Sequence, residues 1–197
     1  DHAGSAWENF RSCPALADSA AMTKALTLKE LYPHQQQAAG TEGNALLIAP
    51  TGSGKTQAAL LWAANNVQEK YVAPPVYYVL PYQASLNAMR LRLGRLIGDD
   101  KVVLQHSRTL QALYRQLLER EYTPKTAKAL ALREINLGKL HVSPVRILTP
   151  YQLLRGAFQL QGHEALWTDC SGGYFILDEI HAYDPHRLGM ILALLRH

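Results

Sequence analysis

The stretch of sequence that decides the fold is NALLIAPTGSGKTQAALLWAANNVQ, residues 44–68. Residues 44–50 form a short apolar run, typical of a buried strand, and residues 56–68 are apolar enough for a helix packed on a sheet. Between them, Gly52 and Gly54 allow a tight turn whose backbone N–H groups converge on phosphate oxygens. The following helix would add the positive end of its dipole. The stretch therefore predicts a strand, a phosphate-binding loop and a helix.

The loop itself is APTGSGKT, residues 49–56, with Ala49 where the usual pattern begins with glycine. We expect Lys55 to reach the β- and γ-phosphates of ATP and the Thr56 hydroxyl to ligate Mg²⁺. The rest of the loop would surround the phosphates through Pro50, Thr51, Gly52, Ser53 and Gly54. The alternative is a glycine-rich turn that only caps a helix.

Four further apolar runs are typical of strands and alternate with helical patterns. The predicted strands are 75–81, 101–106, 145–150 and 174–179; the predicted helices cover 86–97 and 110–118, with a weaker one after Pro124. This alternation predicts an α/β fold, a doubly wound and mainly parallel sheet flanked by helices. Ligands of such folds bind at the carboxyl ends of the strands.

The last of these strands ends in YFILDEIHAYD, residues 174–184. In a phosphate-loop enzyme, Asp178 at this position would hold Mg²⁺, and Glu179 could activate the attacking water. Without the phosphate loop, the same pair would be an ordinary surface strand end. His181 is predicted to relay between the nucleotide and the side that binds nucleic acid rather than to ligate a metal, with a purely structural histidine as the alternative.

Length and composition limit the class of protein. The chain has 197 residues, of which 48% are hydrophobic, enough for one globular domain, predicted at 31–197 after an N-terminal extension or a remnant of a preceding domain at 1–30. No run approaches the roughly 20 apolar residues of a membrane helix. The N-terminus has no secretory pattern. Cys13 and Cys170 match no zinc spacing, which indicates reduced thiols and a cytoplasmic protein.

Charge is concentrated in the middle of the chain. Residues 85–146 hold 12 Lys and Arg against 5 Asp and Glu, although the net charge of the whole chain is only +4. Such a segment fits a surface that binds a polyanion. A set of solvated helix faces is the alternative.

These motifs resemble those of superfamily 2 helicases and, more specifically, of the CRISPR-associated helicase-nuclease of type I interference systems, from about Leu31 to Leu195. LYPHQ is similar to the Q-motif, which implies that Gln35 contacts the adenine edge and that Tyr32 stacks near the base. LPYQASLNAMRLRL, QHSR and TPYQLL are similar to motifs that bind nucleic acid. By this resemblance, the strand of nucleic acid would contact Pro81, Gln83, Arg90, Ser107, Arg108, Thr149 and Gln152.

The DEIHAYD string is the most specific part of the resemblance. It implies that Asp184 contacts the partner RecA-like domain or helps to couple it to the ATP site, with an N-cap or turn role before Pro185 as the alternative. The family is an ATP-driven DNA motor, and this chain resembles its first RecA-like domain. The implied partners are single-stranded DNA, a second RecA-like domain, an HD-type nuclease domain and an RNA-guided surveillance complex, with no membrane.

Two further expectations concern the ends of the chain. The second RecA-like domain, with its arginine finger, would follow His197, so we expect this chain alone to bind nucleotide and hydrolyse it slowly, since such fingers contribute roughly 10³ to 10⁵ in rate. Asp1 is either a ligand left from a nuclease domain or part of an irregular N-terminus.

Two other functions fit the same sequence. One is a translocase of a restriction or remodelling system, or an RNA helicase. The other is a nucleotide-gated protein-docking module that does not grip nucleic acid.

Overall fold

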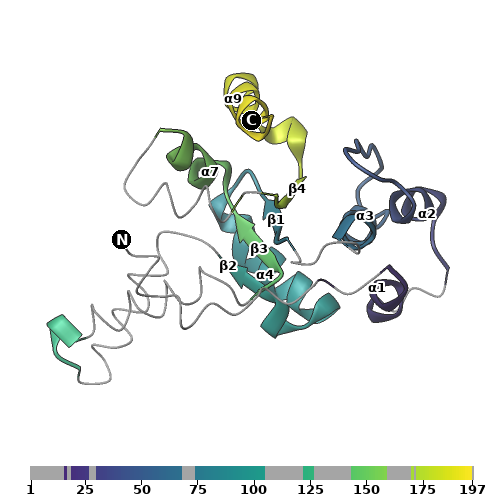
Figure 1. Cartoon of the computed structure of the whole chain (residues 1–197), viewed down its shortest axis with the longest axis horizontal. Helices are drawn as coiled ribbons and strands as arrows, with labels where there is room; N and C mark the ends of the chain where they lie inside the picture. Colours follow the sequence, from purple (N-terminus) through teal and green to yellow (C-terminus); the bar gives the residue numbers. More distant parts are fainter. Residues whose placement is uncertain are drawn as a thin grey trace.

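The computed structural model describes residues 16, 19–26, 30–67, 74–104, 122–126, 143–158, 170 and 172–196 (Figure 1). At its centre lies a four-stranded sheet in the order β2-β3-β1-β4. The strands are β1 (Val76–Val79), β2 (Val102–Leu104), β3 (Val145–Leu148) and β4 (Tyr174–Leu177). All three pairings are parallel. Every strand of this sheet therefore presents its carboxyl end at the same edge, and β1 lies between β3 and β4.

Helices precede, connect and follow these strands. They are α1 (Ser19–Ala25), α2 (Pro33–Ala39), α3 (Lys55–Val67), α4 (Gln83–Ile97), α7 (Pro150–Ala157) and α9 (Pro185–Leu195), with short 3-10 turns η2 (Asp99–Lys101) and η3 (Ile180–Ala182). Both α2 and α9 begin with proline, whose fixed φ suits a first helical turn. Gly98 ends α4 with a φ of 107°, a value that L side chains rarely adopt.

The sheet has a hydrophobic core on each face, because successive side chains of a strand point to opposite faces. Val76 and Tyr78 of β1 belong to the core that contains α1, α3 and α4. Tyr77 and Val79 belong to the core that contains α7 and α9. Figure 1 shows α7 and α9 together on one side of the sheet. The prediction of an α/β sheet flanked by helices on both faces is confirmed.

Most predicted elements are present in shorter form. The strands predicted at 75–81, 101–106, 145–150 and 174–179 correspond to β1, β2, β3 and β4, and the helices at 56–68 and 86–97 correspond to α3 and α4. The helix predicted at 110–118 lies outside the described residues. After Pro124, residues 124–126 are helical, and the rest of that prediction also lies outside the described part.

The strand predicted at 44–50 is wrong, because these residues pair with no described strand. Their side chains are exposed, with Leu46 at 75% and Ile48 at 88% of full exposure. A cavity of about 1470 Å³ is lined by this segment and by β4. A strand needs a hydrogen-bonded neighbour as well as apolar residues, and here the segment does not reach the edge of β4.

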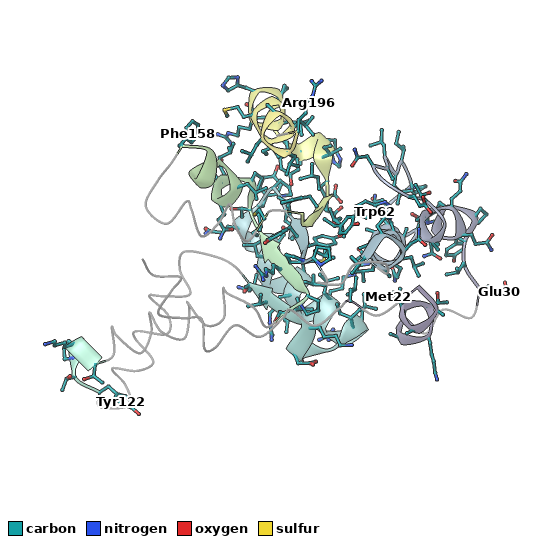
Figure 2. All side chains as sticks on the ribbon, viewed as in Figure 1. Met22, Glu30, Trp62, Tyr122, Phe158 and Arg196 are labelled. Carbon is teal, nitrogen blue, oxygen red and sulfur yellow. The ribbon has the colours of Figure 1, made fainter. Side chains whose placement is uncertain are left out.

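The N-terminal helix α1 lies within the region predicted to precede the domain. Its Met22, labelled in Figure 2, is buried in the same core as α3 and α4, together with Leu16 and Leu26. These residues are therefore part of the core that supports the sheet. Among the described helices, none has the length and apolar character needed to cross a bilayer.

Candidate active site

The phosphate loop turns tightly between the exposed segment and the first residue of α3, Lys55. Gly52 and Gly54 have φ values of 81° and 84°. Backbone hydrogen bonds close the turn, from Ser53 N to Pro50 O at 3.3 Å and from Ala58 N to Gly54 O at 3.0 Å. The Lys55 ammonium donates to the Ala49 carbonyl at 3.1 Å, so its charge lies over the loop. The predicted loop-and-helix arrangement is present.

The N-terminus of α2 packs against this loop. Gln35 Nε2 donates to Gly54 O at 3.3 Å, while Gln35 Oε1 accepts from Tyr32 N at 3.0 Å. His34 Nε2 makes a hydrogen bond with Ser53 O at 2.9 Å. The Gln35 side chain is 1% exposed, and in this structure its amide is hydrogen-bonded to the loop. Its contact with an adenine edge stays a prediction, as does the stacking of a base near Tyr32, which is exposed and stacks on His34.

The acidic pair follows β4 directly. Asp178 is held from two sides, because Tyr78 Oη donates to Asp178 Oδ2 at 2.7 Å and Glu179 N donates to Asp178 Oδ1 at 2.9 Å. Glu179 has a left-handed backbone with a φ of 53°, unusual for a residue with a side chain. Its Oε2 lies 3.3 Å from His181 Nε2. Backbone strain of this kind is often found at functional sites.

Tyr78 connects the acidic pair with the phosphate loop. Burial raises the pKa of the Tyr78 phenol well above its ordinary value, and the Asp178 charge raises that pKa further, while a side-chain hydrogen bond with Thr56 acts in the opposite direction. The phenol therefore stays protonated and donates to Asp178. Tyr78 also belongs to the core that contains α3, the helix that begins at Lys55.

Loop and acidic pair face one cavity, the one of about 1470 Å³ that is also lined by the 44–49 segment. Lys55, Asp178, Glu179 and His181 all line it. Asp178 and Thr56 are hard oxygen donors, the type that Mg²⁺ prefers, so the residues present fit this ion together with nucleotide phosphates. The structure thus brings together the cation for phosphate binding and the two carboxylates that sequence reasoning assigned to the same site.

Residues 32–196 match the family described as DEAD/DEAH box helicase. The chain belongs to this family. The helicase family explains why a phosphate loop and an acidic strand end occur in one parallel sheet, and it implies the use of a nucleotide.

Relatives of this helicase domain include several named for CRISPR. The chain is 30% identical over 182 residues to the CRISPR-associated endonuclease/helicase Cas3 of Thermus thermophilus, covering 86% of this chain and 20% of that protein. It is 26% identical over 164 residues to the protein of the same name from Escherichia coli, covering 78% and 18%. Another relative, at 31% over 160 residues, is the Lhr helicase/probable uracil glycosylase of Mycolicibacterium smegmatis, covering 78% and 10%. The chain thus spans a fifth or less of the length of these proteins.

Four of the seven residues predicted to contact nucleic acid follow neighbouring strands at one edge of the sheet. Pro81 and Gln83 follow β1, and Thr149 and Gln152 follow β3, its neighbour in the sheet. Gln152 Oε1 accepts from Thr149 N at 2.8 Å and from Thr149 Oγ1 at 3.3 Å, so these two side chains are held together. Thr149 is buried. The structure therefore groups four of the seven residues, and their contact with nucleic acid stays a prediction.

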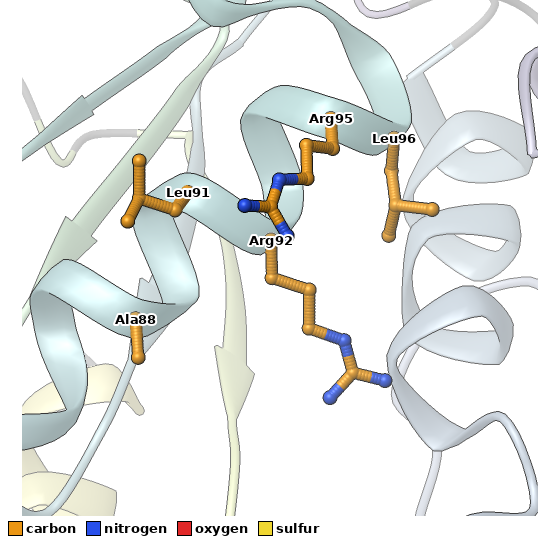
Figure 3. Close-up of a pocket in the computed structure, with 5 residues that line it drawn as sticks. All are labelled: Ala88, Leu91, Arg92, Arg95 and Leu96. Atoms are coloured by element: carbon orange, nitrogen blue, oxygen red, sulfur yellow. The ribbon is translucent and has the colours of Figure 1, made fainter.

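Of the other three predicted contacts, the structure describes only Arg90. Arg90 on α4 lies 3.7 Å from Asp99, an ion pair exposed to solvent. Ser107 and Arg108 lie outside the described residues. Figure 3 shows two other arginines of α4, Arg92 and Arg95, at a surface hollow of about 400 Å³.

Asp184 has the role that the sequence offered as its alternative. Its Oδ1 accepts from His186 N at 2.9 Å and from Arg187 N at 3.3 Å, which caps the N-terminus of α9. The coupling roles of Asp184 and of the exposed His181 stay predictions.

Sequence reasoning missed Tyr78 and His34 as parts of the site. A signal for Tyr78 was present, because a phenol inside an apolar central strand must find a hydrogen-bond partner when buried. His34 carried no comparable signal.

Proposed function

We propose that this chain is the ATP-binding motor domain of a superfamily 2 DNA helicase, coupling ATP hydrolysis to single-strand translocation and duplex unwinding in CRISPR interference. The observation that carries the proposal is the single cavity shared by Lys55, Asp178 and Glu179. The relatives named Cas3 support the CRISPR part. In the whole protein, the partners would be a second RecA-like domain, an HD-type nuclease domain and an RNA-guided surveillance complex.

In this proposal each residue has a defined task. The Lys55 ammonium and the amides of the glycine turn bind the phosphates, and Glu179 orients and deprotonates the attacking water. Asp178 and Thr56 would hold Mg²⁺, which when bound neutralises charge on the phosphate oxygens. The left-handed backbone at Glu179 turns the chain directly after the strand, and the cavity next to that turn is where its carboxylate would meet the water.

Nucleic acid would lie at the ends of β1 and β3, on Pro81, Gln83, Thr149 and Gln152. β1 is the neighbour of β4, so the nucleic-acid side and the ATP side occupy adjacent strand ends. The arginines of α4 would add sequence-independent attraction for phosphates.

A nucleotide titration tests the ATP site. The unmodified chain should bind a fluorescent ATP analogue in the presence of Mg²⁺, and Lys55→Ala should abolish that binding. Lys24→Ala is the matched control, since Lys24 lies at the end of α1 and outside the cavity. Unchanged binding by Lys55→Ala would mean that the loop assignment is wrong.

Binding of oligonucleotides tests the proposed contacts with nucleic acid. Single-stranded DNA should bind at low salt and weaken steeply as salt rises, because phosphate contacts release counterions. Absence of binding even at low salt would favour the protein-docking module. In the whole protein, displacement of RNA rather than DNA duplexes would favour an RNA helicase.

A further inference from the structure

The phenol of Tyr78 occupies a central position in the candidate site. Tyr78 belongs to β1, the strand that pairs with both β3 and β4, and it is 1% exposed. Its side chain lies on the face of the sheet that packs against α3, the helix whose first turn contains Thr56. The ring of Tyr78 is therefore held by core packing, while Tyr78 also lines the cavity of the candidate site.

A hydrogen bond extends from this position. Tyr78 Oη donates to Asp178 Oδ2 at 2.7 Å, between residues 100 positions apart in the sequence. Tyr78 also lines the same cavity as Lys55, the first residue of α3. Asp178 is one of the residues that would ligate the divalent cation, so the phenol holds a proposed metal ligand at the wall of the cavity that contains the phosphate-binding lysine.

The chemistry of these groups leaves room for a cation. A carboxylate oxygen has more than one lone pair, so a hydrogen bond from Tyr78 does not prevent Asp178 from ligating a metal. Among the described residues, the other Asp178 oxygen is held only by the adjacent backbone N–H of Glu179, a local contact within the turn after β4. Tyr78 instead holds the carboxylate from β1, in the core that contains α3.

We propose that Tyr78 is a positioning residue for the metal site, holding the Asp178 carboxylate in place at the cavity where it would ligate a divalent cation. This inference rests on the proposed function, since it requires that the site binds a nucleotide with Mg²⁺. Tyr78 itself touches neither nucleotide nor metal in this account. Its effect is to reduce the freedom of the Asp178 side chain before the ion arrives, which lowers the entropic cost of binding.

The test compares Tyr78→Phe with the unmodified chain in titrations with a fluorescent ATP analogue, with excess Mg²⁺ and with EDTA. We expect the affinity in EDTA to stay within about twofold, because the loop and Lys55 are unchanged. The affinity in Mg²⁺ should fall by about tenfold, the effect of one lost hydrogen bond to a charged group. Equal losses under both conditions, or no loss, would overturn the proposal.

Tyr77→Phe is the matched control. Tyr77 is the neighbouring phenol of the same strand, is fully buried, and accepts a hydrogen bond from Arg146 Nη1 at 3.2 Å on the opposite face. Loss of the Tyr77 hydroxyl should leave the ratio of the nucleotide affinities in Mg²⁺ and in EDTA unchanged. A change of that ratio as large as in Tyr78→Phe would show a general effect of strand packing and overturn the inference.

A second measurement keeps the test decisive if Tyr78→Phe does not fold. 3-Fluorotyrosine placed only at position 78 preserves the shape of the side chain and gives one ¹⁹F signal. That signal should shift when Mg²⁺ and nucleotide are added together, and not when nucleotide is added with EDTA. If the signal does not move in a chain that binds Mg²⁺ and nucleotide, the positioning role of Tyr78 is refuted but the proposed function is not. If the unmodified chain binds no nucleotide, the proposed function itself is refuted.

Discussion

Two glycines of the phosphate loop have nearly the same positive φ and different surroundings, so their alanine variants can be compared directly. Gly52 and Gly54 have φ values of 81° and 84°. A Cβ at Gly52 would meet no atom within 4 Å, whereas a Cβ at Gly54 would overlap Gln35 Nε2. Alanine at either position carries the same strain of a left-handed backbone, about 1–2 kcal/mol. Only Gly54→Ala should also displace Gln35.

The size of the difference follows from the contacts of Gln35. Its amide makes the hydrogen bonds to Gly54 O and from Tyr32 N described above, and each contributes about 0.5–1.5 kcal/mol. Gly54→Ala should therefore destabilise the nucleotide-free chain by about 1–3 kcal/mol more than Gly52→Ala does. For a chain of this size, that corresponds to about 2–12 °C in the midpoint of thermal unfolding.

The assay is thermal and urea unfolding without nucleotide, on both single variants and on each in a Gln35→Ala background. In that background the overlap is gone, so Gly54→Ala should cost no more than Gly52→Ala. Equal effects of the two glycine variants in the unmodified background would refute the reasoning, because Gln35 would then move at no cost. A difference that persists with Gln35→Ala would show that another neighbour is responsible.

Three further predictions follow from other contacts. Asp184→Ala should destabilise the chain by about 0.5–2 kcal/mol through loss of the α9 cap, while Asp184→Asn should retain most of the stability; equal losses in thermal unfolding would contradict a capping role. Glu179→Gly should relieve the left-handed backbone and raise stability by up to about 1 kcal/mol over Glu179→Ala, with hydrolysis lost in both; a lower unfolding temperature for the glycine variant would disprove the strain. Burial raises the pKa of Tyr78 and of Tyr183 above the ordinary value of about 10, so both keep their protons in the folded chain. Their contribution to the free energy of unfolding is therefore complete below pH 10 and is lost as the pH rises above 10. Tyr183→Phe should reduce this loss, measured by urea unfolding between pH 9 and 11. An unaltered dependence of the unfolding free energy on pH would contradict the raised pKa of Tyr183.

Much of the fold could be predicted because apolar runs and helical periodicity are local properties. β1 and β3 are short runs of buried residues, β4 is a short apolar run that is only partly buried, and α3 and α4 each bury apolar residues. The segment 44–50 has the same kind of composition and is not a strand, because pairing depends on a neighbouring edge that no local pattern reveals. The sequence predicts a possible N-cap at Asp184 but not the length of helix α9 that follows Pro185.

The candidate site also contains residues that could be predicted from the sequence and residues that could not. Lys55, Thr56, Asp178 and Glu179 could be predicted, since phosphate and metal chemistry demand particular residue types next to particular elements. The contacts of Gln35 could not, because whether its amide meets a ligand or the loop depends on how closely α2 approaches Gly54. Tyr78 lies between these cases: its burial could be predicted, but its partner 100 residues away required the register of β1 with β4.

The outer edge of β4 has a practical consequence for handling the protein. Within the described part of the chain, β4 pairs on one side only, and exposed leucine and isoleucine side chains of residues 46–48 stand near its other side. Unpaired backbone groups beside apolar side chains are a template on which an extended segment of another molecule can add. Concentrated samples will therefore tend to self-associate through this edge, and a lysine in place of Leu46 or Ile48 is the first substitution to try when a monodisperse preparation is needed.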